Sequence, residues 1–193
     1  MTKWNIKMIK IINFPFCNFY SLERYLRMRK YSYSVLEAND ELNHNDIVFI
    51  PGVGTFAEGV SHLVKNNFDQ ILYKHADNGG KIIGICLGMQ MLFESSEESP
   101  KSKGLGLIKG SCKKIPSCRS FSVPHIGWNT LQTSRNKSSF LKEFLSKDGS
   151  SISDYYFVHS YHAIPENKDT IIASFLHPLG LFTSIVSMNQ IIG

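Results

Sequence analysis

The first half of the chain alternates short apolar runs with amphipathic segments, and this alternation restricts the fold more than any other feature of the sequence. Four strand-like runs, at residues 6–14, 31–37, 46–52 and 80–86, are interspersed with segments of helical spacing. Strands that alternate with helices form βαβ units, in which helices cover a parallel sheet and ligands bind at the carboxyl ends of the strands. The sequence therefore predicts an α/β fold built on a mostly parallel sheet.

The helical segments and the second half of the chain complete this prediction. Helices are expected at residues 20–30, 55–79 and 87–96. Thr55 and Glu58 have the spacing of a capping box, which predicts that a helix begins after Thr55. Polar stretches at 95–103 and 132–139 are expected to be loops. The second half indicates short strands separated by turns, so we expect an added antiparallel portion within a single domain spanning 1–193, in the segments 104–116, 155–165, 171–176 and 181–193.

Charge and cysteine content exclude several classes of protein. The net charge of +5 comes from 21 basic and 16 acidic residues that are scattered along the chain, which is too mild for nucleic-acid binding. No run approaches the roughly 18 consecutive apolar residues of a membrane span, and Lys7 and Lys10 interrupt any signal-peptide core. The four cysteines are too sparse for a disulfide framework. We therefore expect a cytoplasmic protein with neither nucleic-acid nor membrane partners.

Two other patterns do not amount to a metal or cofactor site. Cys112, Cys118 and His125 could be drawn as metal ligands, but their spacing matches no zinc pattern. The glycine-rich segment 104–110 has Lys109 where a dinucleotide-binding motif would need its third glycine, and it follows a polar stretch instead of a strand. We expect no metal and no cofactor.

Cys86 stands in a Gly-x-Cys-x-Gly pattern between a predicted strand and a predicted helix. This is the nucleophile-elbow pattern with sulfur in place of oxygen, in which a strained turn aims the nucleophile out of the sheet. Gly84 and Gly88 have no Cβ, so the chain can make the turn without collision. A helix N-terminus would also stabilise the thiolate. The alternative is a buried, unreactive cysteine that ends a strand.

A second glycine-containing loop supports the nucleophile. Gly52 and Gly54 follow the strand at 46–52 and precede the next helix. Because parallel strands end at the same edge of a sheet, this loop and Cys86 should lie close together. Its backbone N–H groups could then face an oxyanion. The alternative is an ordinary glycine-rich turn.

The motifs together are similar to those of a known family. The chain resembles class I (triad) glutamine amidotransferases, and among them the glutaminase subunits of imidazole glycerol phosphate synthase. The resemblance covers residues 51 to 162, in family order, through "PGVGTF", "GICLGMQMLFESSEE", "GLGLIKG", "VPHIGWN" and "YFVHSYH". It implies a flavodoxin-like fold and glutamine as the substrate.

The resemblance also implies roles for individual residues. Cys86 would attack the side-chain amide of glutamine, and backbone N–H groups near Gly54 and Leu87 would hold the oxyanion. The glutamine would be bound by Gly52, Gln90, Ser160 and Tyr161. From the residues alone, the alternatives are that Gln90 is a solvent-facing helix residue and that His159 is a structural histidine.

The family resemblance further implies a partner. Ammonia would pass into a (β/α)₈-barrel cyclase subunit of a heterodimer, which makes imidazole glycerol phosphate and an aminoimidazole carboxamide ribotide in histidine biosynthesis. Segment 124–129 would lie at that interface, with contacts from Pro124, His125, Gly127, Trp128 and Asn129. Alternatively, Trp128 could fill the core and His125 could be a structural histidine.

The chain departs from the family pattern in two places. In the segment 13–22, Pro15, Phe16 and Cys17 replace the usual glycines, although Asn18 and Ser21 remain. The family's triad is completed by a His-Pro-Glu motif, and the 193 residues contain none. The one His-Pro pair, at His177, is followed by leucine, and we expect it to be a hairpin turn.

Three functional readings follow from the sequence. The first is a glutaminase subunit of histidine biosynthesis that lacks its last strand and C-terminal helix, and with them the catalytic His and Glu, so that this 193-residue form is impaired. The second is an ammonia-supplying subunit for a sugar amidotransferase in surface-polysaccharide synthesis. The third is a non-catalytic docking subunit.

Overall fold

The computed structural model describes residues 7–15, 17, 19–117, 122–133 and 151–193. Cys118, one of the three residues considered as metal ligands, lies outside these ranges, as do Phe16 and Asn18 of the divergent segment. Most of the expected loop at 132–139 also lies outside them.

The first half of the chain forms the parallel part of the main sheet. Its strands stand in the order β2-β1-β3-β4, and their bounds are Ile9–Ile11 (β1), Tyr33–Val35 (β2), Ile47–Ile50 (β3) and Lys81–Gly84 (β4). All three pairings are parallel, and Ile9 faces Tyr33 on one side and Ile47 on the other. The α/β fold with a mostly parallel sheet in this half is confirmed.

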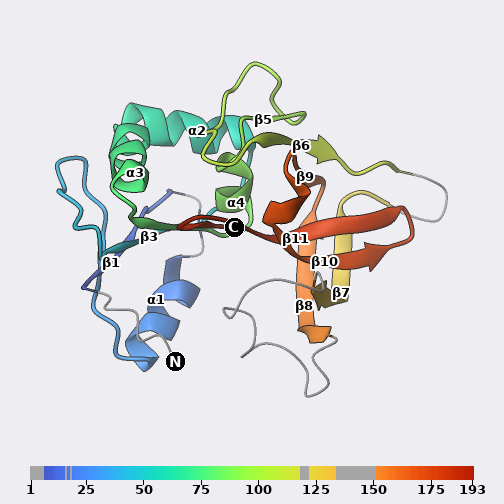
Figure 1. The fold of residues 1–193 in the computed structure, drawn as a ribbon, viewed down its shortest axis with the longest axis horizontal. Coiled ribbons are helices and arrows are strands. Elements are labelled where there is room, and N and C mark those ends of the chain that lie inside the picture. The colour runs from blue at the N-terminus through green and yellow to red at the C-terminus, as the bar shows by residue number, and fades with distance from the viewer. Residues whose placement is uncertain (1–6, 16, 18, 118–121, 134–150) are drawn as a thin grey trace.

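Helices cover both faces of this sheet, as Figure 1 shows. Helix α1 (Phe19–Met28) lies on one face, and α2 (Phe56–Lys65), α3 (Phe68–Asp77) and α4 (Leu87–Met91) lie on the other. Leu26 of α1 packs with Ile9, Ile11 and Ile47 in a small core. The larger core lies on the opposite face, where Phe56, Leu63 and Leu72 are fully buried. Within the described residues, no helix is long and apolar enough to cross a membrane.

The helical region expected at 55–79 consists of two helices. The capping box is confirmed, because the Thr55 hydroxyl accepts from the Glu58 N–H and the Glu58 carboxylate accepts from the Thr55 N–H. The chain breaks at Asn67, whose φ of 59° lies in the left-handed region that asparagine tolerates better than most residues. The helical region predicted at 55–79 is therefore confirmed, and the structure divides it into α2 and α3.

The helix expected at 87–96 is shorter than predicted, and the acidic segment after it has backbone partners. α4 ends at Met91, and Ser95–Ser96 form strand β5. The Glu94 carboxylate accepts from the Gly110 N–H at 2.9 Å, and the Glu98 carboxylate accepts from the Phe56 N–H at 2.6 Å. Glu98 thus satisfies a backbone donor in the first turn of α2. The stretch 95–103 is therefore tied to α2, although the sequence predicted only a loop.

The second half of the chain is antiparallel, as predicted. The main sheet continues in the order β4-β12-β11-β10-β7-β8, with bounds His125–Thr133 (β7), Ser151–His159 (β8), Ile171–His177 (β10), Gly180–Met188 (β11) and Ile191–Ile192 (β12). β12 pairs in parallel with β4 and antiparallel with β11, so it joins the two halves. A smaller sheet is formed by β5, β6 (Gly110–Lys114) and β9 (Tyr161–Pro165), and a short 3₁₀ helix, η2, spans Lys168–Thr170.

Candidate functional site

Cys86 occupies a strained turn between β4 and α4. Its φ of 58° and ψ of −113° lie outside the regions that residues with a side chain prefer. Gly84 makes the turn possible, because a Cβ there would lie 2.7 Å from backbone atoms of Gly88 and Met89. A Cβ on Gly88 would overlap the carbonyl oxygen of Ile50. The geometry is that expected of a nucleophile elbow.

The loop after β3 lies against this turn. The Ile85 N–H donates to the Ile50 carbonyl at 2.9 Å, and a Cβ on Gly52 would lie 3.1 Å from the Leu87 Cβ. Gly54 has a φ of 99°, a conformation that favours glycine. The prediction that the two glycine-containing loops meet at one edge of the sheet is therefore confirmed.

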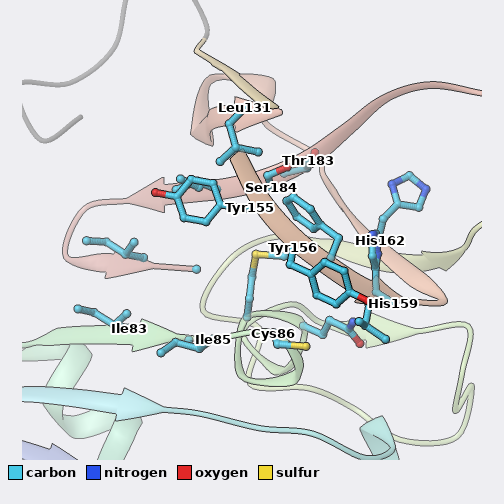
Figure 2. A pocket seen from close by; sticks show the side chains of 18 of the residues that line it. Ile83, Ile85, Cys86, Leu131, Tyr155, Tyr156, His159, His162, Thr183 and Ser184 are labelled. Atoms are coloured by element: carbon cyan, nitrogen blue, oxygen red, sulfur yellow. The ribbon is translucent and has the colours of Figure 1, made fainter. Parts of the chain in front are cut away.

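Cys86 opens into a cavity of about 730 Å³ between the β4 edge and strand β8. Figure 2 shows Ile83 and Ile85 on one side, with Tyr155 and Tyr156 across from them. Of the residues predicted to bind glutamine, Gln90 and Tyr161 line this cavity together with Cys86. Gln90 is therefore not simply a solvent-facing helix residue.

The other predicted site residues lie around the cavity and not in its lining. Gly52 and Leu87 are buried in the contact between the two loops, whereas Gly54 is exposed on the loop after β3. Ser160 stands between β8 and β9, where its carbonyl accepts from the Ile115 N–H at 2.9 Å. The Ser160 carbonyl thus already has a partner within the fold.

The pKa of the Cys86 thiol is raised. Protein atoms packed around the sulfur raise the pKa by desolvating the thiolate, although the side chain is exposed to the cavity, and the Leu87 backbone N–H lowers the pKa by a smaller amount. The sequence predicted the opposite direction, from the dipole of the following helix. Desolvation is the larger influence on this thiol, and the following helix α4 opposes it only through the Leu87 N–H. The thiol is consequently protonated at neutral pH, and attack by sulfur requires a base.

Four histidines gather on the antiparallel half, a grouping that sequence reasoning missed. The His125 ring stacks on Phe175 with centroids 5.2 Å apart and meets the rings of His159 and His177 edge-on at 5.3 and 5.1 Å. The fourth, His162, stacks on Phe182 at 4.3 Å. His159 and His162 also line the cavity. The residues come from four strands, so no sequence spacing could have placed them together.

The hydrogen bonds of these histidines define two of their roles. His125 Nε2 lies 2.7 Å from the side-chain oxygen of Asn129, so both of these predicted interface residues have a partner within the chain. His177 Nδ1 accepts from the Leu179 N–H at 3.2 Å between β10 and β11. The prediction that His177 is a hairpin-turn residue is therefore confirmed.

Trp128 projects from the opposite face of β7. Its side chain is 70% exposed, and its ring lies 5.4 Å from that of Tyr156 on β8. Ile126 and Val158 are exposed on the same face, since they are paired in register. The alternative that Trp128 fills the core is wrong.

No metal site accompanies these features in the described ranges. Within them, no three His, Cys, Asp or Glu side chains are grouped as they would be around a metal ion. Cys112 is buried, and its pKa is raised to about 12 by burial and by the nearby Glu98 carboxylate. It is therefore a poor metal ligand and a poor nucleophile.

Comparisons with known proteins agree with the fold and the motifs. Residues 6–115 match the family described as CobB/CobQ-like glutamine amidotransferase domain. Imidazole glycerol phosphate synthase subunit HisH of Bacillus licheniformis is 37% identical over 171 residues, which cover 86% of this chain and 77% of that protein. The same subunit of Prochlorococcus marinus is 37% identical over 166 residues, with 86% and 75% covered.

Two further comparisons extend this likeness. Imidazole glycerol phosphate synthase hisHF, chloroplastic, of Arabidopsis thaliana is 36% identical over 166 residues, which cover 85% of this chain and 27% of that protein. Among solved structures, PurLQS from Thermotoga maritima aligns with a TM-score of 0.72 over 96% of this chain and 84% of that one, at 17% identity. This last likeness concerns the fold, which is that of flavodoxin-like glutamine amidotransferases.

Proposed function

Because the chain belongs to the HisH-type class I glutamine amidotransferases, we propose that it hydrolyses glutamine to glutamate and ammonia with Cys86 as the nucleophile. The observation that carries this proposal is the strained backbone of Cys86, which faces a cavity beside a glycine-containing loop. A positive φ at a residue with a side chain is costly and is typical of nucleophile elbows.

The reaction proceeds through a thioester. The Cys86 sulfur attacks the side-chain amide carbon of glutamine, and the carbonyl electrons move to oxygen. The N–H groups of Gly54 and Leu87 hold this oxyanion; Gly54 lies on the loop after β3, and Leu87 begins α4 directly after Cys86. The amide nitrogen of this tetrahedral intermediate takes up the proton that the thiol has lost, the C–N bond breaks and ammonia leaves, and water hydrolyses the thioester to glutamate and free thiol.

Glutamine is held by Gly52, Gln90, Ser160 and Tyr161. Gln90 and Tyr161 support this assignment because they line the cavity that contains Cys86. Ser160 is the single residue between β8 and β9, and its neighbours His159 and Tyr161 both line the cavity. Gly52 supports it less directly, through its contact with the turn that carries Cys86.

The proposed reaction needs a general base for Cys86, and the described residues do not provide an evident one. The 193 residues contain no His-Pro-Glu sequence, and in the described part of the chain no hydrogen bond joins Cys86 to an imidazole. With the pKa of the thiol raised by burial, little thiolate forms at neutral pH. We therefore propose that this polypeptide hydrolyses glutamine slowly by itself; loss of the base from a protease triad costs roughly 10⁶ in turnover.

Ammonia release from glutamine tests the proposal. The 193-residue chain is expected to release ammonia slowly, and Cys86→Ala is expected to abolish that release. Cys17→Ser is the matched control, because Cys17 is a half-buried free thiol outside the cavity, and its rate should equal that of the parent chain. Release that Cys86→Ala leaves unchanged would exclude Cys86 as the nucleophile. Release at a rate typical of the family, if Cys86→Ala abolishes it, would instead contradict the proposal that this polypeptide lacks the base.

We also propose that the ammonia passes to a (β/α)₈-barrel cyclase subunit, which uses it to make imidazole glycerol phosphate and an aminoimidazole carboxamide ribotide in the cytoplasm. The name of the related proteins supports a partner subunit, since each is a subunit of imidazole glycerol phosphate synthase. Segment 124–129 is the proposed contact, because Trp128 is exposed there and large exposed aromatic side chains are frequent at interfaces. The three free cysteines among the described residues suit a reducing compartment.

Replacing Trp128 by aspartate tests the contact. The variant is expected to bind the cyclase subunit from the same organism at least tenfold more weakly, as is usual when an interface aromatic is lost. Binding is measured by titration calorimetry, and folding by circular dichroism. Val64→Asp on α2 is the control, because Val64 is an exposed apolar residue far along the chain from this segment. If both substitutions weaken binding of the cyclase subunit equally, or if neither weakens it, the interface lies elsewhere.

A further inference from the structure

The cavity beside Cys86 is larger and less polar than glutamine requires. Its volume of about 730 Å³ falls in the range that accommodates drug-sized ligands, roughly 300 to 1,000 Å³. Glutamine is a small molecule with a positive and a negative charge. The cavity lining, as far as the described residues define it, contains no Asp, Glu, Lys or Arg side chain that could pair with either charge.

The walls away from Cys86 are mainly aliphatic and aromatic, with Thr183 and Ser184 of β11 as uncharged polar side chains among them. β4 and the residue after it contribute Ile83 and Ile85, β11 and β12 contribute Ile185 and Ile192, and β8 contributes Tyr155 and Val158. Figure 2 shows the side chains of Ile83, Ile85 and Tyr155 on opposite sides of this space, with Cys86 at one end. An uncharged apolar chain bonded to the sulfur would be surrounded by these side chains.

We propose that Cys86 also accepts acyl groups from apolar esters and thioesters with good leaving groups, and that the acyl chain lies between β4 and β8 in this apolar part of the cavity. This activity is distinct from glutamine hydrolysis. Its substrate class is defined by an uncharged acyl chain of several carbons. Burial of each added methylene should favour binding of the chain.

The transfer step requires no base from the protein. The Cys86 thiol first loses its proton to solvent, and the sulfur electron pair then attacks the ester carbonyl carbon. The C–O bond to the leaving group breaks, and an aryl oxide leaves with that electron pair. The product is an S-acyl cysteine, which water later cleaves to a carboxylate and the free thiol.

This reaction avoids the steps that make the amide difficult. The amide nitrogen of glutamine must be protonated before it can leave as ammonia, whereas p-nitrophenolate leaves as a stable anion and needs no acid. Ester acylation therefore requires only the thiolate and room for the acyl chain. Because desolvation raises the pKa of the Cys86 thiol, the acylation rate should rise with pH above neutrality.

The test uses p-nitrophenyl acetate, butyrate and hexanoate with the 193-residue chain. We expect a burst of about one p-nitrophenolate per chain followed by slow turnover, and an intact mass increased by one acyl group. The acylation rate at low substrate concentration should rise about threefold to fourfold per methylene. Cys86→Ala should abolish both the burst and the mass increase, and Cys17→Ser should retain them.

Two aspartate variants test the position of the acyl chain. Val158→Asp places a charge at the cavity, at a side chain that is 54% exposed and therefore tolerant of substitution. It should lower the hexanoate rate at least tenfold and the acetate rate much less. Leu181→Asp is the matched control, because Leu181 is 64% exposed on β11 and does not line the cavity. Its rates should equal those of the parent chain.

Three results would overturn the inference: rates independent of chain length, labelling that survives Cys86→Ala, or equal effects of the two aspartate variants. A chain that is acylated by esters but releases no ammonia from glutamine would support this inference and contradict the proposed function. Ammonia release without ester acylation would support the proposed function and contradict this inference.

Discussion

Gly88→Ala is expected to prevent the chain from folding under conditions in which the parent chain is stable. A Cβ at this position would overlap the carbonyl oxygen of Ile50, which is backbone of the central strand β3 and is bonded to the Ile85 N–H. Neither atom belongs to a flexible side chain, so α4 would have to move away from the sheet. The cost should reach at least about 4 kcal/mol, in the exceptional range for one substitution. That is comparable with the whole stability of many domains.

Gly127→Ala is the matched control for this substitution. Gly127 lies in β7, its φ is not positive, and a Cβ there would meet nothing within 4 Å. Its free energy of unfolding should stay within about 1 kcal/mol of the parent value. Urea unfolding followed by circular dichroism measures both variants. A Gly88→Ala protein that unfolds at the parent's urea concentration would show that α4 is not held against β3 as described.

Acidification is expected to destabilise the antiparallel half before most carboxylates titrate. Burial lowers the pKa of His159, and the neighbouring His125 and His177 lower it further, although the Tyr161 carbonyl opposes them by accepting from Nδ1. His159 Nε2 is buried and has no partner among the described residues, so a proton there would add an unpaired charge. Burial also lowers the pKa of His162 and His177; Glu97 opposes the effect at His162, and Lys168 adds to it.

The sign of this pH dependence follows from the direction of the shifts. A histidine with a lowered pKa in the folded chain is neutral in both states above about pH 6.5, so its stabilising contribution is fully present there. Below that pH the unfolded chain binds a proton that the folded chain binds only at lower pH. Stability therefore falls as the pH falls, by at most about 1.4 kcal/mol per pH unit for one histidine.

Urea midpoints at about pH 7.5, 6.5 and 5.5 measure this loss. His159→Gln should unfold with a smaller difference between the highest and lowest pH than the parent chain. His44→Gln provides the control, since His44 is exposed before β3 and outside the histidine group. An unchanged pH dependence in His159→Gln would mean that His159 is not the group that resists protonation.

Local patterns in the sequence predicted those parts of the structure that depend on local physics. The alternation of strands and helices gave the parallel half, and the Thr55–Glu58 spacing gave the start of α2. The Gly-x-Cys-x-Gly pattern predicted the strained turn at Cys86, because only residues without a Cβ fit on either side of it. Each of these features is determined within a few neighbouring residues.

Features that depend on distant partners escaped prediction. The break at Asn67 was missed because its flanking sequence has helical spacing on both sides. The hydrogen bond from the Phe56 N–H to the Glu98 carboxylate joins residues 42 positions apart in the sequence. The polar stretch after α4 therefore resembled an ordinary loop. The direction of the Cys86 pKa shift depends on how far the folded chain desolvates the sulfur, which is not visible in the pattern of glycines.

The two-residue strand β12 has a consequence for how the chain folds during synthesis. The pairing of Ile191 with Ile82 completes one edge of β4, yet more than half of the chain is synthesised between these two residues. Until Ile191 and Ile192 emerge, one side of β4 lacks this parallel neighbour, and an unpaired apolar strand edge can recruit other chains. Until β12 is synthesised, this edge of β4 can therefore pair with a neighbouring nascent chain unless a chaperone covers it.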